Sequence, residues 1–233
     1  LVEKNGTFNN ALEVVVTAAD YRGKSFPGDR ATLTLAMKPD SVERLRAGGF
    51  RILNSIDLPP GRYQLRVAAR ESNTKRAGSV VYDLDVPDFS KEKLSISGLA
   101  LTSATSGLIP TARPKDPLAK MLPGPMTTYR DFVQGDELAL FAEIYDNTRQ
   151  PHKVDIEASL RAEGGQAVFQ TREERDSSEL AGGPGGYGFR ARVPLKDVPP
   201  GLYVLRVSGK TRIGDQQEVV RETILRVVAP PAP

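Results

Sequence analysis

The chain has 233 residues, no cysteine and one histidine, and its 32 Lys and Arg side chains nearly balance 29 Asp and Glu, for a net charge of +3. The lack of cysteine excludes disulfides and thiolate metal sites, and so small a net charge gives no support to nucleic-acid binding. No apolar run approaches the roughly 20 residues that cross a bilayer as a helix, which predicts no membrane insertion.

The first part of the chain is predicted to form short β-strands separated by turns. Apolar segments rich in β-branched residues predict strands at 12–19 and 31–37. The next segment has Pro39 and Asp40 at its head and Gly48 and Gly49 at its end, which fits one or two helical turns. Three further strands are expected at 50–57, 62–70 and 79–86, the last two joined as a hairpin.

The second part is predicted to repeat this scheme. Strands are expected at 94–102, 138–145, 154–162, 167–171, 187–193, 203–209 and 218–228. The Pro-rich stretch 105–130 predicts an extended excursion, and the charged, glycine-rich stretch 172–186 predicts a mobile loop. The glycines of 182–188 lack the Lys and Ser or Thr of a phosphate-binding loop, so they predict a hairpin connection.

One pattern, Asp-x-Pro-Pro-Gly-x-Tyr-x-Leu-Arg-Val, occurs twice, at 57–67 and at 197–207. Repetition at the spacing of a small β-domain indicates two copies of one fold in tandem. We therefore expect an all-β protein of two tandem antiparallel β-sandwich domains of immunoglobulin or fibronectin type III character. The predicted domains are residues 1–89 and residues 90–233, the second containing the Pro-rich excursion.

The repeated pattern also predicts a local structure. In immunoglobulin-like sandwiches a Tyr near the start of strand F forms a "tyrosine corner", in which its hydroxyl bonds back to the preceding turn. Glycine before it permits the positive φ of a sharp turn. The positions concerned are Pro59, Pro60, Gly61, Tyr63 and Leu65 in the first copy and Pro199, Pro200, Gly201, Tyr203 and Leu205 in the second. An ordinary core tyrosine after a tight turn is the alternative, and it predicts the same burial.

These stretches resemble fibronectin type III strands, and residues 50–103 resemble the C-terminal region of the von Willebrand factor A-related domain proteins of acidobacteria. The resemblance implies β-rich modules that follow an exported A-type domain, and hence an extracellular, periplasmic or cell-envelope location. The A domain's metal-binding Asp-x-Ser-x-Ser pattern does not occur in the sequence, so that domain's metal chemistry is not implied here. Because the chain starts at Leu1, we expect it to be a piece of a longer protein.

Two sets of side chains are candidate sites of chemistry. Asp83, Asp85 and Asp88 are the best candidates for a calcium site, although three carboxylates on a solvated strand face are the simpler interpretation. His152 lies in a polar turn and is expected to be a surface residue rather than a general base. No catalytic residue and no cofactor are therefore predicted.

Arg62, Arg66 and Arg70 share one face of the strand predicted at 62–70, opposite Tyr63 and Leu65. This row is a possible partner surface, and a solvated outer face is the alternative. The chain has no Trp, which weakens the case for glycan stacking. The predicted function is a noncatalytic spacer or protein-interaction region whose partners are proteins or other domains of the same chain. The alternative is a specific ligand-binding module, for adhesion or for glycans, that uses the 105–130 or 172–186 loops.

Overall fold

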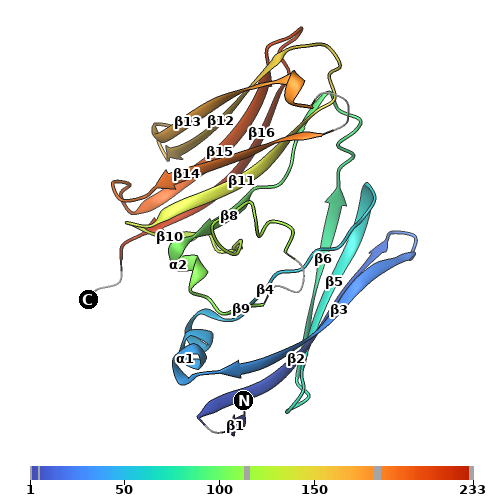
Figure 1. The fold of residues 1–233 in the computed structure, drawn as a ribbon, viewed down its shortest axis with the longest axis vertical. Helices are drawn as coiled ribbons and strands as arrows, with labels where there is room; N and C mark the ends of the chain where they lie inside the picture. The colour runs from blue at the N-terminus through green and yellow to red at the C-terminus, as the bar shows by residue number, and fades with distance from the viewer. Residues whose placement is uncertain (1, 5, 113–115, 181–184, 231–233) are drawn as a thin grey trace. The chain divides into compact units, whose positions relative to one another are not determined.

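The computed structural model describes residues 2–4, 6–112, 116–180 and 185–230 (Figure 1). Among these residues the helices are α1 (Pro39–Gly48), α2 (Ala104–Gly107) and the 3-10 turn η1 (Ser177–Leu180), and the other elements are strands. The predicted all-β class is therefore confirmed. The chain divides into two compact units, the first comprising Leu1–Asp88 with Ile109–Pro117 and the second Phe89–Leu108 with Leu118–Pro233.

The first unit contains a five-stranded antiparallel sheet. Its strands are β1 (Val2–Lys4), β2 (Thr7–Asp20), β3 (Ser25–Met37), β5 (Gly61–Glu71) and β6 (Ala77–Val86). β2 pairs with β3 along one edge and with β1 and β5 along the other, and β6 pairs with β5. A separate short parallel pair joins β4 (Arg51–Ile52) to β9 (Thr111–Ala112). This pairing explains why Ile109–Pro117 groups with the first unit.

The buried side chains of the first unit lie on one face of β2 and β5 and in the chain around α1. β5 alternates as predicted, with Tyr63 buried and Arg62 and Arg66 exposed. Val14 and Val16 of β2 are buried, as are Val42 of α1 and Leu53 of the segment that follows it, and α1 contacts β2. Proline at the helix start and Gly49 at its end, with a φ of +75°, account for the limits of α1.

The second unit is a sandwich of two sheets (Figure 1). One sheet has the order β10-β16-β15-β12-β13, and the other has the order β14-β11-β7, with β8 also pairing with β11. All pairs are antiparallel except β10 with β16. The strands are β7 (Leu94–Ile96), β8 (Ala100–Ser103), β10 (Asp131–Val133), β11 (Glu137–Asp146), β12 (Lys153–Ala162), β13 (Ala167–Asp176), β14 (Gly186–Pro194), β15 (Gly201–Thr211) and β16 (Glu218–Val228).

Both sheets of the second unit contribute fully buried side chains to one core. Leu140 and Ile144 of β11 are enclosed, as are Ile156 of β12 and Leu205 of β15. With β11 and β14 in one sheet and β12, β15 and β16 in the other, the strands occupy the places of B, E, C, F and G in an immunoglobulin domain. The second unit is thus an immunoglobulin-like β-sandwich.

One sheet of the first unit has the same strand order as one sheet of the second unit, but the rest of the two folds differs. The order β3-β2-β5-β6 matches β13-β12-β15-β16, and Tyr63 stands opposite Leu84 as Tyr203 stands opposite Leu225. The described residues of the first unit contain no counterpart of the β14-β11-β7 sheet. This unit therefore lacks, among those residues, the second sheet of the expected sandwich. Between β3 and β5 the chain forms α1 and β4, where the second unit has β14 between β13 and β15.

Residues 118–127 of the expected Pro-rich excursion pack onto the second unit. Leu122 is buried in a cluster with Ala139 and Phe141 of β11. The Thr102 hydroxyl donates to the Pro125 carbonyl at 2.7 Å, which fixes the chain over that face. Just before it, α2 begins with a capping box, in which the Ser106 amide donates to the Ser103 hydroxyl and the Ser103 amide donates to the Ser106 hydroxyl. Residues 113–115 of the predicted excursion lie outside the described residues.

The mobile loop predicted at 172–186 is wrong over its first part. Residues 172–176 extend β13, and residues 177–180 form η1. All five residues 172–176 are charged, and the exposed Arg172 and Glu174 pair with Asp155 and Lys153 of β12, so they belong to a solvated strand face. Gly186 and Gly188, from the predicted hairpin connection, lie in β14, and residues 181–184 are outside the described residues.

Candidate functional site

Both repeated tyrosines bond back to the turn that precedes them. The Tyr63 hydroxyl donates to the Pro59 carbonyl at 2.7 Å, and the Tyr203 hydroxyl donates to the Pro199 carbonyl at the same distance. Both side chains are buried. This is the geometry of a tyrosine corner. Gly61 has the expected positive φ, +154°, and a Cβ there would lie 3.3 Å from the Tyr63 hydroxyl oxygen.

The remaining residues of the two copies differ in their surroundings. Gly201 does not share the positive φ of Gly61, so the predicted role of glycine holds only in the first copy. Leu205 is fully buried in the sandwich core, whereas Leu65 is half-buried. Pro59, Pro60 and Pro200 are exposed in the two turns. The repeat therefore builds a corner in both units, and only the second unit closes a complete core over it.

His152 is enclosed, and the prediction of a surface turn residue is wrong. Its side chain is 1% exposed, with Nε2 2.8 Å from the Asp146 Oδ2 and Nδ1 2.8 Å from the Gln150 carbonyl oxygen. The contact of Nε2 with the carboxylate is close but is not aligned as a hydrogen bond. Both ring nitrogens thus face oxygen atoms inside the fold.

The turn that carries His152 is folded back by polar contacts. Asp146 accepts the Thr148 amide at 2.9 Å, and the Asn147 side chain donates to the carbonyls of Phe89 and Glu92, each at 2.7 Å. The His152 amide donates to the Ser177 hydroxyl. In the first unit Asp20 likewise accepts the amides of its own turn, at Arg22 and Lys24. Both turns follow a strand that ends in Asp, and this feature is visible in the sequence. No residue near His152 in the sequence predicts that its side chain contacts Asp146.

A phenol completes this buried cluster, which we call the Asp146 cluster (Asp146, His152, Tyr187). The Tyr187 hydroxyl donates to the Asp146 Oδ2 at 3.3 Å. Burial, followed by the charge of Asp146, raises the pKa of Tyr187 well above its usual value. The Arg175 guanidinium carbon lies 5.6 Å from the centre of the Tyr187 ring. A carboxylate, an imidazole and a phenol could exchange protons, but with two of the side chains 1% exposed the cluster has no access for a substrate.

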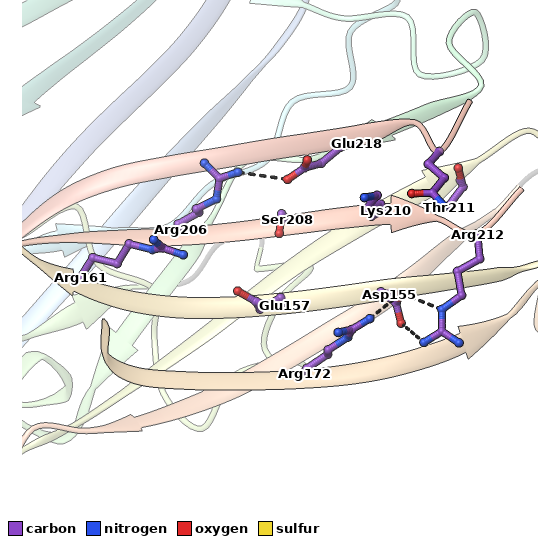
Figure 2. A pocket seen from close by; sticks show the side chains of 11 residues that line it. Asp155, Glu157, Arg161, Arg172, Arg206, Ser208, Lys210, Thr211, Arg212 and Glu218 are labelled. Carbon is purple, nitrogen blue, oxygen red and sulfur yellow. Dashed lines mark hydrogen bonds and ion pairs between the residues drawn. The ribbon is translucent and has the colours of Figure 1, made fainter. Parts of the chain in front are cut away.

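The outer face of the β16-β15-β12-β13 sheet carries a group of charged side chains (Figure 2). Asp155 lies between Arg172, at 2.6 Å, and Arg212, at 2.6 and 2.8 Å. Farther along the face, Arg206 contacts Glu218 at 3.1 Å and Glu222 at 2.8 Å. All of these except Glu222 line, together with Arg161, Lys210 and Glu157, a shallow cavity of about 480 Å³. Charges of both signs alternate here, so the face has no strong preference for an anion or a cation.

The ion pairs of Asp155 on this face make the stability of the fold depend on pH. Hydrogen bonding by Arg212, and then by Arg172, holds the pKa of Asp155 below its usual range. A carboxyl whose pKa is lowered in the folded state stabilises the fold above its unfolded pKa of about 4, and this contribution is lost as the pH falls through the lower folded value. Asp155→Asn should therefore reduce the difference in unfolding free energy between pH 7 and pH 2.5, measured by urea denaturation. Glu157→Gln, on the same face and without an ion pair among the described residues, should leave that difference unchanged.

The predicted basic row is paired rather than free. Arg62 lies 3.6 Å from Asp85, Arg70 contacts Glu13 at 2.8 Å, and Arg66 donates to the Gln64 side chain. The calcium candidates are not gathered: Asp83 and Asp85 are exposed on β6 and Asp88 follows the strand. Across the described residues, no group of three or more His, Asp or Glu side chains could hold a metal ion. Beside Arg62, the exposed Tyr21 and Asp83 help line an open cavity of about 600 Å³.

Comparisons with known proteins do not identify a family. No family model matches the chain. No curated protein matches it. Among solved structures it is similar to a calcium-binding mutant of β-glucuronidase 2 of Bacteroides uniformis (TM-score 0.35, 10% identity), to the β-glucuronidase of that organism (0.33, 12%) and to β-glucuronidase 2 covalently bound to cyclophellitol-6-carboxylate aziridine (0.32, 11%). Each match covers 93% of this chain but only 24% of the other, and scores this low do not establish a common fold. In the part of the chain that the structure describes, no helix is long and apolar enough to span a membrane.

Proposed function

We propose that the chain is a noncatalytic accessory region of a larger exported bacterial protein, acting as a spacer or protein-interaction module. The observation that carries this proposal is the enclosure of His152. It is the single histidine of a chain without cysteine, and its side chain is 1% exposed with both nitrogens against fixed acceptors. A nucleophile activated by histidine would need an imidazole that reaches the substrate. The resemblance of residues 50–103 to modules that follow an exported A-type domain supports the accessory role.

The alternative function, specific ligand binding through the 105–130 or 172–186 segments, has less support. Residues 172–176 are paired in β13, and residues 118–127 pack against Phe141 and Thr102. Residues 118–127 and 172–176 thus complete the second unit rather than extend from it. A role in protein interaction needs no such loop, because strand edges and sheet faces also bind proteins.

The proposal is tested by turnover. We expect the purified chain to hydrolyse chromogenic esters, glycosides and peptides no faster than buffer does, and His152→Gln to leave these rates unchanged. Because that substitution disturbs a buried cluster, its folding is checked by far-UV circular dichroism. Asp155→Asn, on the exposed charged face, serves as a second variant. Turnover that either folded variant abolishes would overturn the proposal.

A further inference from the structure

Strand β6 is exposed on both of its faces. Val80, Val81 and Tyr82 are 65%, 57% and 64% exposed, although successive residues point to opposite sides of the sheet. Among the described residues β6 pairs only with β5, so its other edge presents unpaired amide and carbonyl groups. An apolar, unpaired edge strand is a template for another strand.

The second unit provides an internal comparison, because β16 occupies the same place as β6. The pairs Gly61 with Val86 and Gly201 with Val227 fix the alignment of the two hairpins. In this alignment Val80, Val81 and Tyr82 correspond to Arg221, Glu222 and Thr223. The equivalent strand therefore carries polar side chains where β6 presents apolar ones.

The neighbouring strand shows the same contrast. In the second unit Arg206 stands opposite Glu222 and bonds to it at 2.8 Å. In the first unit Arg66 stands opposite Val81 and is bonded to Gln64 instead. An exposed valine thus replaces the acidic partner of this arginine. Exposed apolar side chains lower solubility, and contact with another protein would cover them.

Charge along β6 indicates which partner fits. Lys75 and Arg76 precede the strand, and Asp83 and Asp85 lie toward its end, so one end is basic and the other acidic. A second β6 laid antiparallel sets the basic end of each copy beside the acidic end of the other. Centred on Val81, this register places Val80 opposite Tyr82 of the second copy, a favourable β-branched and aromatic pair. A parallel arrangement would instead bring like charges together.

We infer that β6 is the contact through which two copies of the chain pair, edge to edge and antiparallel, so that the sheets of their first units become continuous. The inference rests on the proposed function in that it takes the module to act by binding protein. Because the two-fold pairing uses the β6 edge of both copies, the pair is closed and does not grow into a fibre.

The first test is the mass of the full chain in solution. Sedimentation or light scattering across a concentration series should show a dimer of twice the 25.3 kDa monomer. The triple variant Val80→Arg, Val81→Glu, Tyr82→Thr places the β16 residues on β6 and should raise the dissociation constant by more than about tenfold. Ile224→Thr, which removes an equally exposed apolar side chain from the second unit, should leave it unchanged.

The second test locates the two-fold axis, using the absence of native cysteine. Val81→Cys should form a disulfide-linked dimer on mild oxidation, whereas Ile224→Cys should form no covalent dimer under the same conditions. A chain that is monomeric at all concentrations, open-ended assembly, or a dimer that the triple variant does not weaken would each overturn the inference. None of these outcomes bears on turnover, so the proposed noncatalytic role is judged separately.

Discussion

Replacing Tyr203 with alanine is expected to lower the free energy of unfolding by roughly 3 to 5 kcal/mol. The ring is 6% exposed within the sandwich core, so its removal leaves a cavity among fully buried neighbours such as Leu205. The variant also leaves the Pro199 carbonyl without its hydroxyl donor. Urea denaturation of the full chain, followed by circular dichroism, measures the loss.

Two further variants separate the ring from the hydroxyl. Tyr203→Phe keeps the packing and removes one hydrogen bond, so about 1 kcal/mol should be lost. Tyr129→Ala removes a tyrosine that is 52% exposed and should change stability by no more than about 0.5 kcal/mol. A loss below about 1 kcal/mol for Tyr203→Ala would contradict a buried corner that stabilises the second unit. Tyr63→Ala removes the same bond in the first unit, together with an edge-to-face contact with Phe26, whose ring centre lies 5.0 Å away.

Features encoded within one short segment could be predicted from the sequence. The alternation of β5, the start of α1 at Pro39 and the two tyrosine corners each depend on residues that are neighbours in the chain. The order of strands within a sheet does not. The repeated pattern predicted two like sandwiches, whereas α1 and β4 occupy the chain between β3 and β5 and leave the first unit without a second large sheet among the described residues.

The Asp146 cluster could not be predicted for the same reason. Tyr187 lies 41 residues beyond Asp146 in sequence, and the two meet only because β14 pairs with β11. Composition also led to the wrong prediction at β13, because its run of charged residues is typical of a mobile loop. The exposed Arg172 and Glu174 pair across to β12, and single-sequence composition does not distinguish a solvated strand face from an unfolded segment.

Replacing Asp146 with alanine is expected to cost about 3 to 5 kcal/mol, because it leaves the enclosed His152 ring without its carboxylate partner. The Tyr187 hydroxyl and the Thr148 amide lose the same acceptor. The first unit offers a control: Asp20 makes the same kind of turn bonds at Arg22 and Lys24, so Asp20→Ala should cost only about 1 kcal/mol.

A double-mutant cycle isolates the pair itself. If the charge of Asp146 offsets the cost of burying His152, His152→Leu in the Asp146→Ala background should recover part of the lost unfolding free energy. The reason is that the double variant no longer buries an unpaired ring. Losses that simply add would show that the two side chains stabilise the 147–152 turn independently. The unfolding free energies of the two single variants and the double variant, measured by urea denaturation at pH 7, decide between these results. They show whether charge, or hydrogen bonds alone, hold this turn to the second unit.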